Sequence, residues 1–173
     1  MNTSKAQREA TRLLESLKVR SAPVDVNGIA AAVGLKIIYE NFTDDISGLL
    51  ITRDSKGVIG VHSKHALVRQ RFTIAHEIGH FVLRHHSESG DHVHVDEGWK
   101  TTARNERSAK GIDPHEIEAN RFAAALLMPE DLLRTKVNEF RHKSLSEGDV
   151  FALAQCFKVS EQAMTLRLRN LGL

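Results

Sequence analysis

The apolar residues of this chain change their spacing near residue 65, and that change limits the folds open to it. Before it, three runs rich in branched residues predict strands at 35–39, 47–52 and 58–62. After it, small and apolar residues recur at the spacing of one helix face: Phe72, Ala75, Gly79, Val82 and Leu83. Because the strands form one block with helices on either side, the pattern indicates an α+β fold and not an alternating α/β fold.

Helical periodicity also occurs towards both ends of the chain. An apolar stripe runs through residues 4–18, and a second helix face follows residue 115. Further helix ends are marked by capping or helix-breaking residues: Asp25, Gly34, Pro129, Ser146 and Ser160. We therefore expect one domain, residues 1–173, with a small N-terminal three-stranded sheet and a mainly helical C-terminal half. Residues 144–173 would form a helical extension packed on the core.

The composition is ordinary for a globular protein in water, with 41% hydrophobic and 27% charged residues. No apolar run reaches the roughly 20 residues that cross a bilayer, and the N-terminal segment lacks the apolar stretch of a secretory signal. A single cysteine excludes an internal disulfide framework and fits a reducing cytoplasm, where we expect the protein to act. The net charge of +2 is too small to indicate nucleic-acid binding on its own.

The motif HEIGH, residues 76–80, lies inside the helical stretch. His76 and His80 are four residues apart, so both imidazoles project from one helix face and can reach one ion at about 2.0–2.1 Å. Glu77 projects one position round the helix, where its carboxylate can act as a base toward a water on an open coordination position. This pattern predicts a catalytic zinc site. The alternative is chance, with both histidines solvated or hydrogen-bonded in the core.

Catalytic zinc usually takes three protein ligands, so the third must come from another element. The helix after residue 115 offers Glu116 as that ligand and Asn120, on the same face, as a partner that orients a ligating histidine. Glu118 is the rival ligand, although it points about 200° away from Glu116 round the helix. The alternative for Glu116 is a carboxylate that interacts favourably with the dipole at a helix N-terminus.

The remaining histidines have less specific interpretations. His85 and His86 end the helix that carries the motif, where positive charge suits the dipole. Residues 91–96, DHVHVD, could bind a second metal, but their alternation favours a strand with polar residues on one side. His94 and His115 are candidates for stabilising the oxyanion of a peptide hydrolysis reaction.

Two stretches resemble the ImmA/IrrE family of zinc metallo-endopeptidases. They are residues 71–80, RFTIAHEIGH, and residues 116–129, EIEANRFAAALLMP. The segments near residues 23–35 and 157–168 are also similar to that family. The resemblance covers roughly residues 20–173, and the two central motifs together are its most specific part.

The resemblance implies a zincin-like metalloprotease fold with HExxH on one helix and a glutamate ligand on the next. His76, His80 and Glu116 would hold Zn²⁺, and Glu77 would be the catalytic acid and base. Mn²⁺ or Fe²⁺ can occupy similar ligands. Family members commonly cut a helix-turn-helix (Xre-like) repressor, or act beside such antitoxin regulators, so that genes of mobile elements or stress responses are switched on. As in zinc proteases generally, a strand at 47–52 is expected to pair with an extended substrate.

The tail, residues 153–169, suggests a function of another class. Its order of helix, tight turn and basic second helix is typical of helix-turn-helix proteins. On that hypothesis the protein binds DNA or acts as a non-proteolytic regulatory partner. The alternative is a structural helix pair packed on the catalytic core. The small net charge favours the structural pair, so neither a membrane nor nucleic acid is an expected partner.

Overall fold

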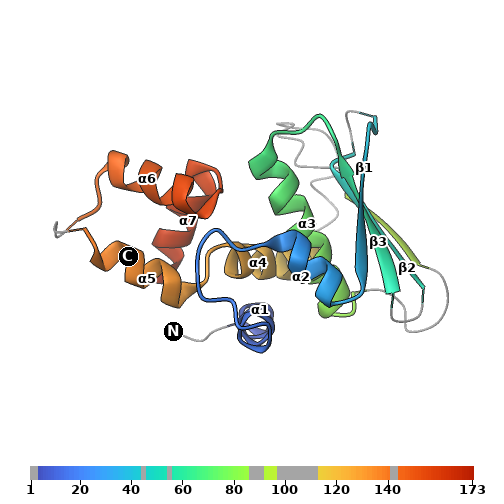
Figure 1. Cartoon of the computed structure of the whole chain (residues 1–173), viewed down its shortest axis with the longest axis horizontal. Coiled ribbons are helices and arrows are strands. Elements are labelled where there is room, and N and C mark those ends of the chain that lie inside the picture. Colours follow the sequence, from blue (N-terminus) through green and yellow to red (C-terminus); the bar gives the residue numbers. More distant parts are fainter. Residues whose placement is uncertain (1–3, 44–45, 54–55, 86–91, 97–112, 141–143) are drawn as a thin grey trace.

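The computed structural model describes residues 4–43, 46–53, 56–85, 92–96, 113–140 and 144–173. These residues form seven helices and four strands in an α+β arrangement, shown in Figure 1. The helices are α1 (Lys5–Ser16), α2 (Val26–Ala32), α3 (Leu67–Val82), α4 (Pro114–Leu127), α5 (Glu130–Asn138), α6 (Glu147–Phe157) and α7 (Glu161–Leu171). The strands are β1 (Leu35–Glu40), β2 (Gly48–Arg53), β3 (Lys56–His62) and β4 (His92–Asp96).

The described strands form one mixed sheet in the order β1-β3-β2-β4. β1 runs parallel to β3, whereas β2 runs antiparallel to both β3 and β4. The first three strands match the three that the apolar runs predict. The fourth comes from the alternating segment near residue 94, whose pattern favoured a strand. The expected three-stranded sheet is therefore one strand too small. The missing strand, β4, follows α3 in the sequence and pairs with β2 at the edge of the sheet.

Both edges of β2 are occupied between Gly48 and Thr52. Leu50, for example, lies opposite Ile59 of β3 on one side and His94 of β4 on the other. Since a strand has only two hydrogen-bonding edges, the prediction that this strand pairs with a substrate is wrong. Within the described sheet, the strands with an unpaired edge are β1 and β4.

α3 contacts both the sheet and α4 and so lies between them, and α1 packs on α4. Figure 1 shows the sheet at one end of the molecule and α5, α6 and α7 at the other. The hydrophobic core fills the space between these layers, with fully buried side chains such as Ile59 of β3, Ile78 of α3 and Phe122 of α4. The sheet and other helices pack around α3, so the side chains on this helix are held in place.

The predicted helix ends are confirmed. Asp25 accepts a hydrogen bond from the Gly28 amide at the start of α2, and Gly34 follows that helix with a φ of 88°. Serine side chains cap α6 and α7, the first of them in a capping box with Asp149. Pro129 takes the N-cap position of α5. Local capping chemistry therefore accounts for where these helices begin and end.

The start of α3 is an exception, because Ala66 at its N-cap offers no side-chain acceptor. Gln70 secures this end in another way. Its side-chain amide donates to the carbonyl groups of Ser63 and His65, at 2.9 Å each, so the turn from β3 is tied to the first turn of α3. None of the described helices is long and apolar enough to span a bilayer.

Candidate metal centre

α3 and α4 bring three candidate ligands to one point. His76 Nε2 lies 3.0 Å from His80 Nε2 and 3.2 Å from Glu116 Oε2, and His80 Nε2 lies 3.2 Å from Glu116 Oε1. Within the described part of the chain, these residues are the one group of three or more His, Cys, Asp or Glu side chains with ligand atoms within 4.8 Å of one another. The structure thus places Glu116, and not Glu118, beside both histidines.

The donor atoms fit a divalent cation. Ligands at about 2.0–2.1 Å from a tetrahedral zinc ion lie roughly 3.3 Å from one another. The three distances of 3.0, 3.2 and 3.2 Å are close to that value. His76 Nδ1 lies 3.1 Å from Asn120 Oδ1, which only accepts, so Nδ1 carries the proton and Nε2 directs a lone pair at the Glu116 carboxylate. Two acceptors that face each other in this way require a cation or a proton between them.

A close approach of α4 to α3 makes this arrangement possible. A Cβ atom at Gly79 would lie 3.1 Å from Phe122 Cδ1 and 3.3 Å from Ala119 Cα. The glycine in HEIGH therefore leaves room for the backbone of α4 beneath the histidines. At the start of α4, Asp113 caps the helix and Pro114 occupies its first position, so Glu116 falls in the first turn and projects toward α3.

Glu77 and His94 complete the site. The Glu77 side chain is fully buried beside the ligands, and its Oε2 lies 3.4 Å from His94 Nδ1. His94 Nε2 lies 3.0 Å from Glu116 Oε1, and the His94 ring centroid lies 4.0 Å from that of His80. Pairing of β4 with β2 is what brings His94 to this position. The sheet, α3 and α4 therefore each contribute a polar side chain to one site.

The pKa shifts of the candidate ligands favour the protonation states that bind a cation. Burial lowers the pKa of His80 to about 4, although its hydrogen bond with Glu116 acts in the opposite direction. Burial would raise the pKa of Glu116, but the contacts of its carboxylate with His76, His80 and His94 hold it well below its usual range. Hydrogen bonds to Glu116 and Glu77 raise the pKa of His94 to about 10. Near neutral pH, His80 is therefore neutral and Glu116 ionised, as metal binding requires.

His85 occupies a position that the sequence interpretation missed. Its Nδ1 lies 3.2 Å from His80 Nδ1, and its Nε2 lies 3.1 Å from Glu118 Oε2. The imidazole is buried, and burial lowers its pKa. The expectation of a cationic residue at a helix end is wrong, because α3 ends at Val82 and the chain then turns back toward His80. Helical periodicity carries no signal for a residue beyond the helix end.

His115, the other candidate for stabilising an oxyanion, lies elsewhere. Its ring stacks on His85, with centroids 4.4 Å apart and an interplanar angle of 14°. Its side chain is largely exposed, and its Nδ1 lies 3.9 Å from Asp113 Oδ1. Of the two candidates, His94 is therefore the one in contact with Glu77.

The hypothesis of a second metal site concerns residues 91–96. The strand that the alternation favoured is confirmed as β4. Asp91 lies outside the described residues, as do the side chains of His92 and Asp96 and the whole of His86.

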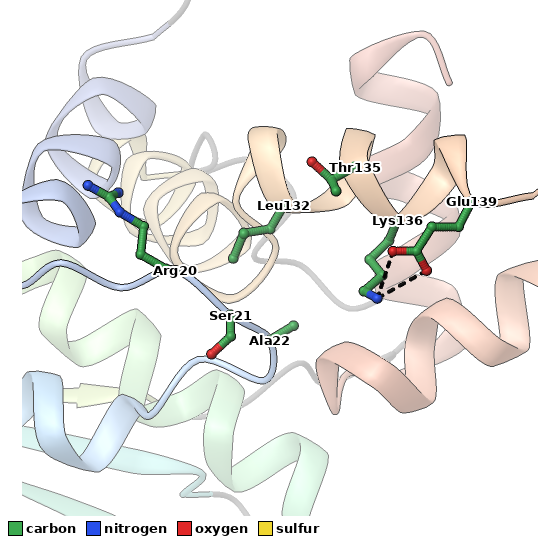
Figure 2. A pocket seen from close by; sticks show the side chains of 7 residues that line it. All are labelled: Arg20, Ser21, Ala22, Leu132, Thr135, Lys136 and Glu139. Carbon is green, nitrogen blue, oxygen red and sulfur yellow. Dashed lines mark hydrogen bonds and ion pairs between the residues drawn. The ribbon is translucent and has the colours of Figure 1, made fainter.

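A separate pocket of about 330 Å³ lies between the N-terminal segment at Arg20–Ala22 and α5, as Figure 2 shows. Lys136 and Glu139 line it and form an exposed ion pair at 2.9 Å. None of the candidate metal ligands lines this pocket, so it supplies no group to the metal centre.

Comparison with known sequences agrees with this geometry. Residues 30–169 match the Peptidase_M78 family, which is described as the IrrE N-terminal-like domain. The match spans most of the chain and includes every residue of the candidate metal centre. A search of curated proteins found no match to the chain.

Proposed function

The chain belongs to the Peptidase_M78 family, and on that premise we propose that it is a zinc-dependent endopeptidase that cuts a protein substrate. One observation carries the proposal: His76, His80 and Glu116 converge on one point beside the buried carboxylate of Glu77. Family membership supports the peptidase activity, and the set of donor atoms supports a divalent metal. Mn²⁺ or Fe²⁺ could take the place of Zn²⁺ with these ligands.

Each residue of the site would have a separate role. His76, His80 and Glu116 hold the metal, and Asn120 orients His76 through its 3.1 Å contact with Nδ1. The bound metal would polarise the scissile carbonyl and acidify a water molecule. Glu77 accepts a proton from the attacking water and passes it to the leaving amine, because its carboxylate lies inside the site and away from solvent.

His94 would stabilise the negative charge that develops on the carbonyl oxygen. Its ring nitrogens lie 3.4 Å from Glu77 and 3.0 Å from Glu116, so the ring stands beside both the proposed base and a proposed ligand. To stabilise the oxyanion, one N–H would turn from its carboxylate to the substrate. A donor fixed on a strand needs little reorganisation during the reaction, which is the condition for effective stabilisation of an oxyanion.

The substrate would bind as an extended strand on the edge of β4 that no other described strand pairs. This proposal replaces the pairing with residues 47–52, whose two edges are occupied. β4 carries His94 into the site, so a strand added beside it would lie along the metal centre. Main-chain hydrogen bonds in such an arrangement give affinity with little demand on the sequence of the substrate.

We propose that the substrate is a helix-turn-helix repressor or antitoxin regulator and that the reaction takes place in the cytoplasm. The resemblance of residues 71–80 and 116–129 to ImmA/IrrE proteases supports this choice. Cutting such a repressor would release the genes that it silences, including stress-response genes.

The test is to mix the zinc-loaded protein with the repressor encoded by the neighbouring gene, with and without a chelator. We expect discrete fragments without chelator, none with chelator, and recovery when Zn²⁺ is restored. An intact repressor under all three conditions would contradict the proposed substrate. Cleavage that continues in chelator would contradict the metal mechanism.

The alternative function, DNA binding or non-proteolytic regulation through the C-terminal helices, receives less support. Arg167 of α7 is buried and donates to the Met128 carbonyl at 3.1 Å. This basic side chain is therefore not available to contact a DNA phosphate. A mobility shift that weakens as salt rises would favour the DNA-binding alternative.

A further inference from the structure

His80 takes part in a chain of contacts that leads away from the candidate metal centre. His80 Nδ1 lies 3.2 Å from His85 Nδ1, and His85 Nε2 lies 3.1 Å from Glu118 Oε2. The imidazole of His85 is 5% exposed, whereas Glu118 is 38% exposed. This series of contacts thus runs from the buried site to a carboxylate at the surface of α4.

The backbone after α3 is arranged to hold His85 in this position. Arg84 adopts a left-handed conformation with a φ of 57°. Its amide donates to the Phe81 carbonyl and the His85 amide donates to the His80 carbonyl, the two bonds of a Schellman motif. The bond from the His85 amide places its side chain directly beside that of His80.

Metal binding would fix the direction of the hydrogen bonds in the series His80, His85 and Glu118. His80 must present its Nε2 lone pair to a metal, so its proton lies on Nδ1 and is donated to His85 Nδ1. His85 then carries its own proton on Nε2 and donates it to the Glu118 carboxylate. Every donor meets an acceptor, and the ring of His80 is held at the angle that points Nε2 at Glu116.

We infer that His85 and Glu118 form a relay that orients His80 and increases its basicity toward the metal. They are positioning residues, since neither touches the proposed reacting atoms. The relay is a longer form of the carboxylate–histidine–metal arrangement, with a second imidazole between the carboxylate and the ligand. Glu118 thereby acts on the site from the face of α4 that points away from Glu116. This inference rests on the proposed metal site.

The test measures Zn²⁺ affinity of the full chain by competition with a chromophoric chelator. His85→Asn keeps an acceptor near His80 but loses the link to Glu118, and Glu118→Gln removes the charge at a partly exposed position. We expect affinity to fall by about 10–100-fold in His85→Asn and by about tenfold in Glu118→Gln, the range typical of lost metal-ligand partners. Glu139→Gln, an exposed carboxylate at the C-cap of α5, is the matched control and should stay within about twofold of the unmodified protein.

A second measurement needs no variant. Imidazole nitrogen NMR of the zinc-loaded protein should show His85 protonated on Nε2 and unprotonated on Nδ1, a state that a purely structural role does not require. A proton on His85 Nδ1, or equal affinity in Glu118→Gln and Glu139→Gln, would overturn the relay. If the unmodified protein itself fails to bind Zn²⁺, the proposed function fails instead, so the two failures are distinguishable.

Discussion

At the scale of single residues, Glu77 is a carboxyl side chain with no exposed surface. Burying an isolated carboxylate is costly, and proteins do it where a cation or a reaction needs the charge. Its contact with His94, which in turn contacts Glu116, links it to the candidate metal ligands. That environment fits a proton acceptor that works next to a metal.

Replacing this carboxylate should separate metal binding from catalysis. Glu77→Gln keeps the size of the side chain and removes the base, so we expect Zn²⁺ affinity close to that of the unmodified protein. Peptide-bond cleavage should fall by about 10²–10⁴-fold, the usual contribution of a general base. Measuring both quantities on the same sample checks the prediction. Cleavage of a verified substrate at the unmodified rate would refute the assigned role.

His94 should act on the rate of the chemical step. His94→Gln should lower kcat by roughly 10²–10³-fold with little change in KM, because the lost hydrogen bond forms mainly in the transition state. Steady-state kinetics with a peptide from the repressor would measure both constants. Lys136→Gln is the control, since that exposed side chain pairs with Glu139 away from the metal centre. A similar loss in both variants would argue against a specific role for His94.

At the scale of elements, the site depends on how closely α4 approaches α3. Gly79 has no side chain at the contact, and the atoms around it belong to fully buried Phe122 and to the backbone of Ala119. Neither neighbour can move without disturbing the core. The same packing sets the position of Glu116, because it lies on α4 one turn before Ala119 and Asn120.

Gly79→Val should therefore weaken both the fold and the metal site. Overpacking of a core contact costs typically about 1–3 kcal/mol, and separation of the two helices would draw Glu116 away from the histidines. Thermal unfolding and Zn²⁺ affinity should both decrease. Gly148→Ala is the control, since among the described residues only Ser146 Oγ lies within 4 Å of the added Cβ, at 3.7 Å. This variant should be neutral or slightly stabilising. Unchanged stability in Gly79→Val would show that the contact is looser than the distances indicate.

At the scale of the whole molecule, we propose that residues 1–173 form one domain with the C-terminal helices packed on the core. Arg71, on the helix of the metal site, donates to the Val24 carbonyl at 2.9 Å and to the Lys158 carbonyl at 3.2 Å. Arg134 of α5 donates to the Leu171 carbonyl at 3.2 Å. These bonds connect the segment before α2, the central helix and the C-terminal helices. Burial lowers the pKa of Arg71, although Asp25 acts in the opposite direction.

Arg71→Ala should lower stability by about 1.5–3 kcal/mol, because it leaves two carbonyl groups without a charged donor. The measurement is thermal unfolding, which should be a single transition in the unmodified protein. Arg12→Ala is the control, since its ion pair with Glu9 lies at the surface and contributes less than about 1 kcal/mol. Two separate transitions in the unmodified protein would argue against one domain.

The sequence by itself determined the features that depend on neighbours along the chain. Helix geometry places His76 and His80 on one face whatever else the protein does, and capping chemistry sets the ends of α2, α6 and α7. The apolar runs located β1, β2 and β3, and the order of elements indicated the α+β fold. Spacing also offered Glu116 as a ligand and Asn120 as its companion, but left Glu118 as a rival.

Tertiary structure alone decided the relations between elements. The packing of α4 on α3 at Gly79 brings Glu116 to the histidines and leaves Glu118 to His85. The return of β4 to the sheet brings in His94 and removes the free edge of β2. Such contacts depend on which surfaces bury the most apolar area together, and no periodicity along the chain encodes that choice. The sequence could therefore name the candidate residues of the site, whereas it could not show that they meet at one point or that Glu116, and not Glu118, lies beside the histidines.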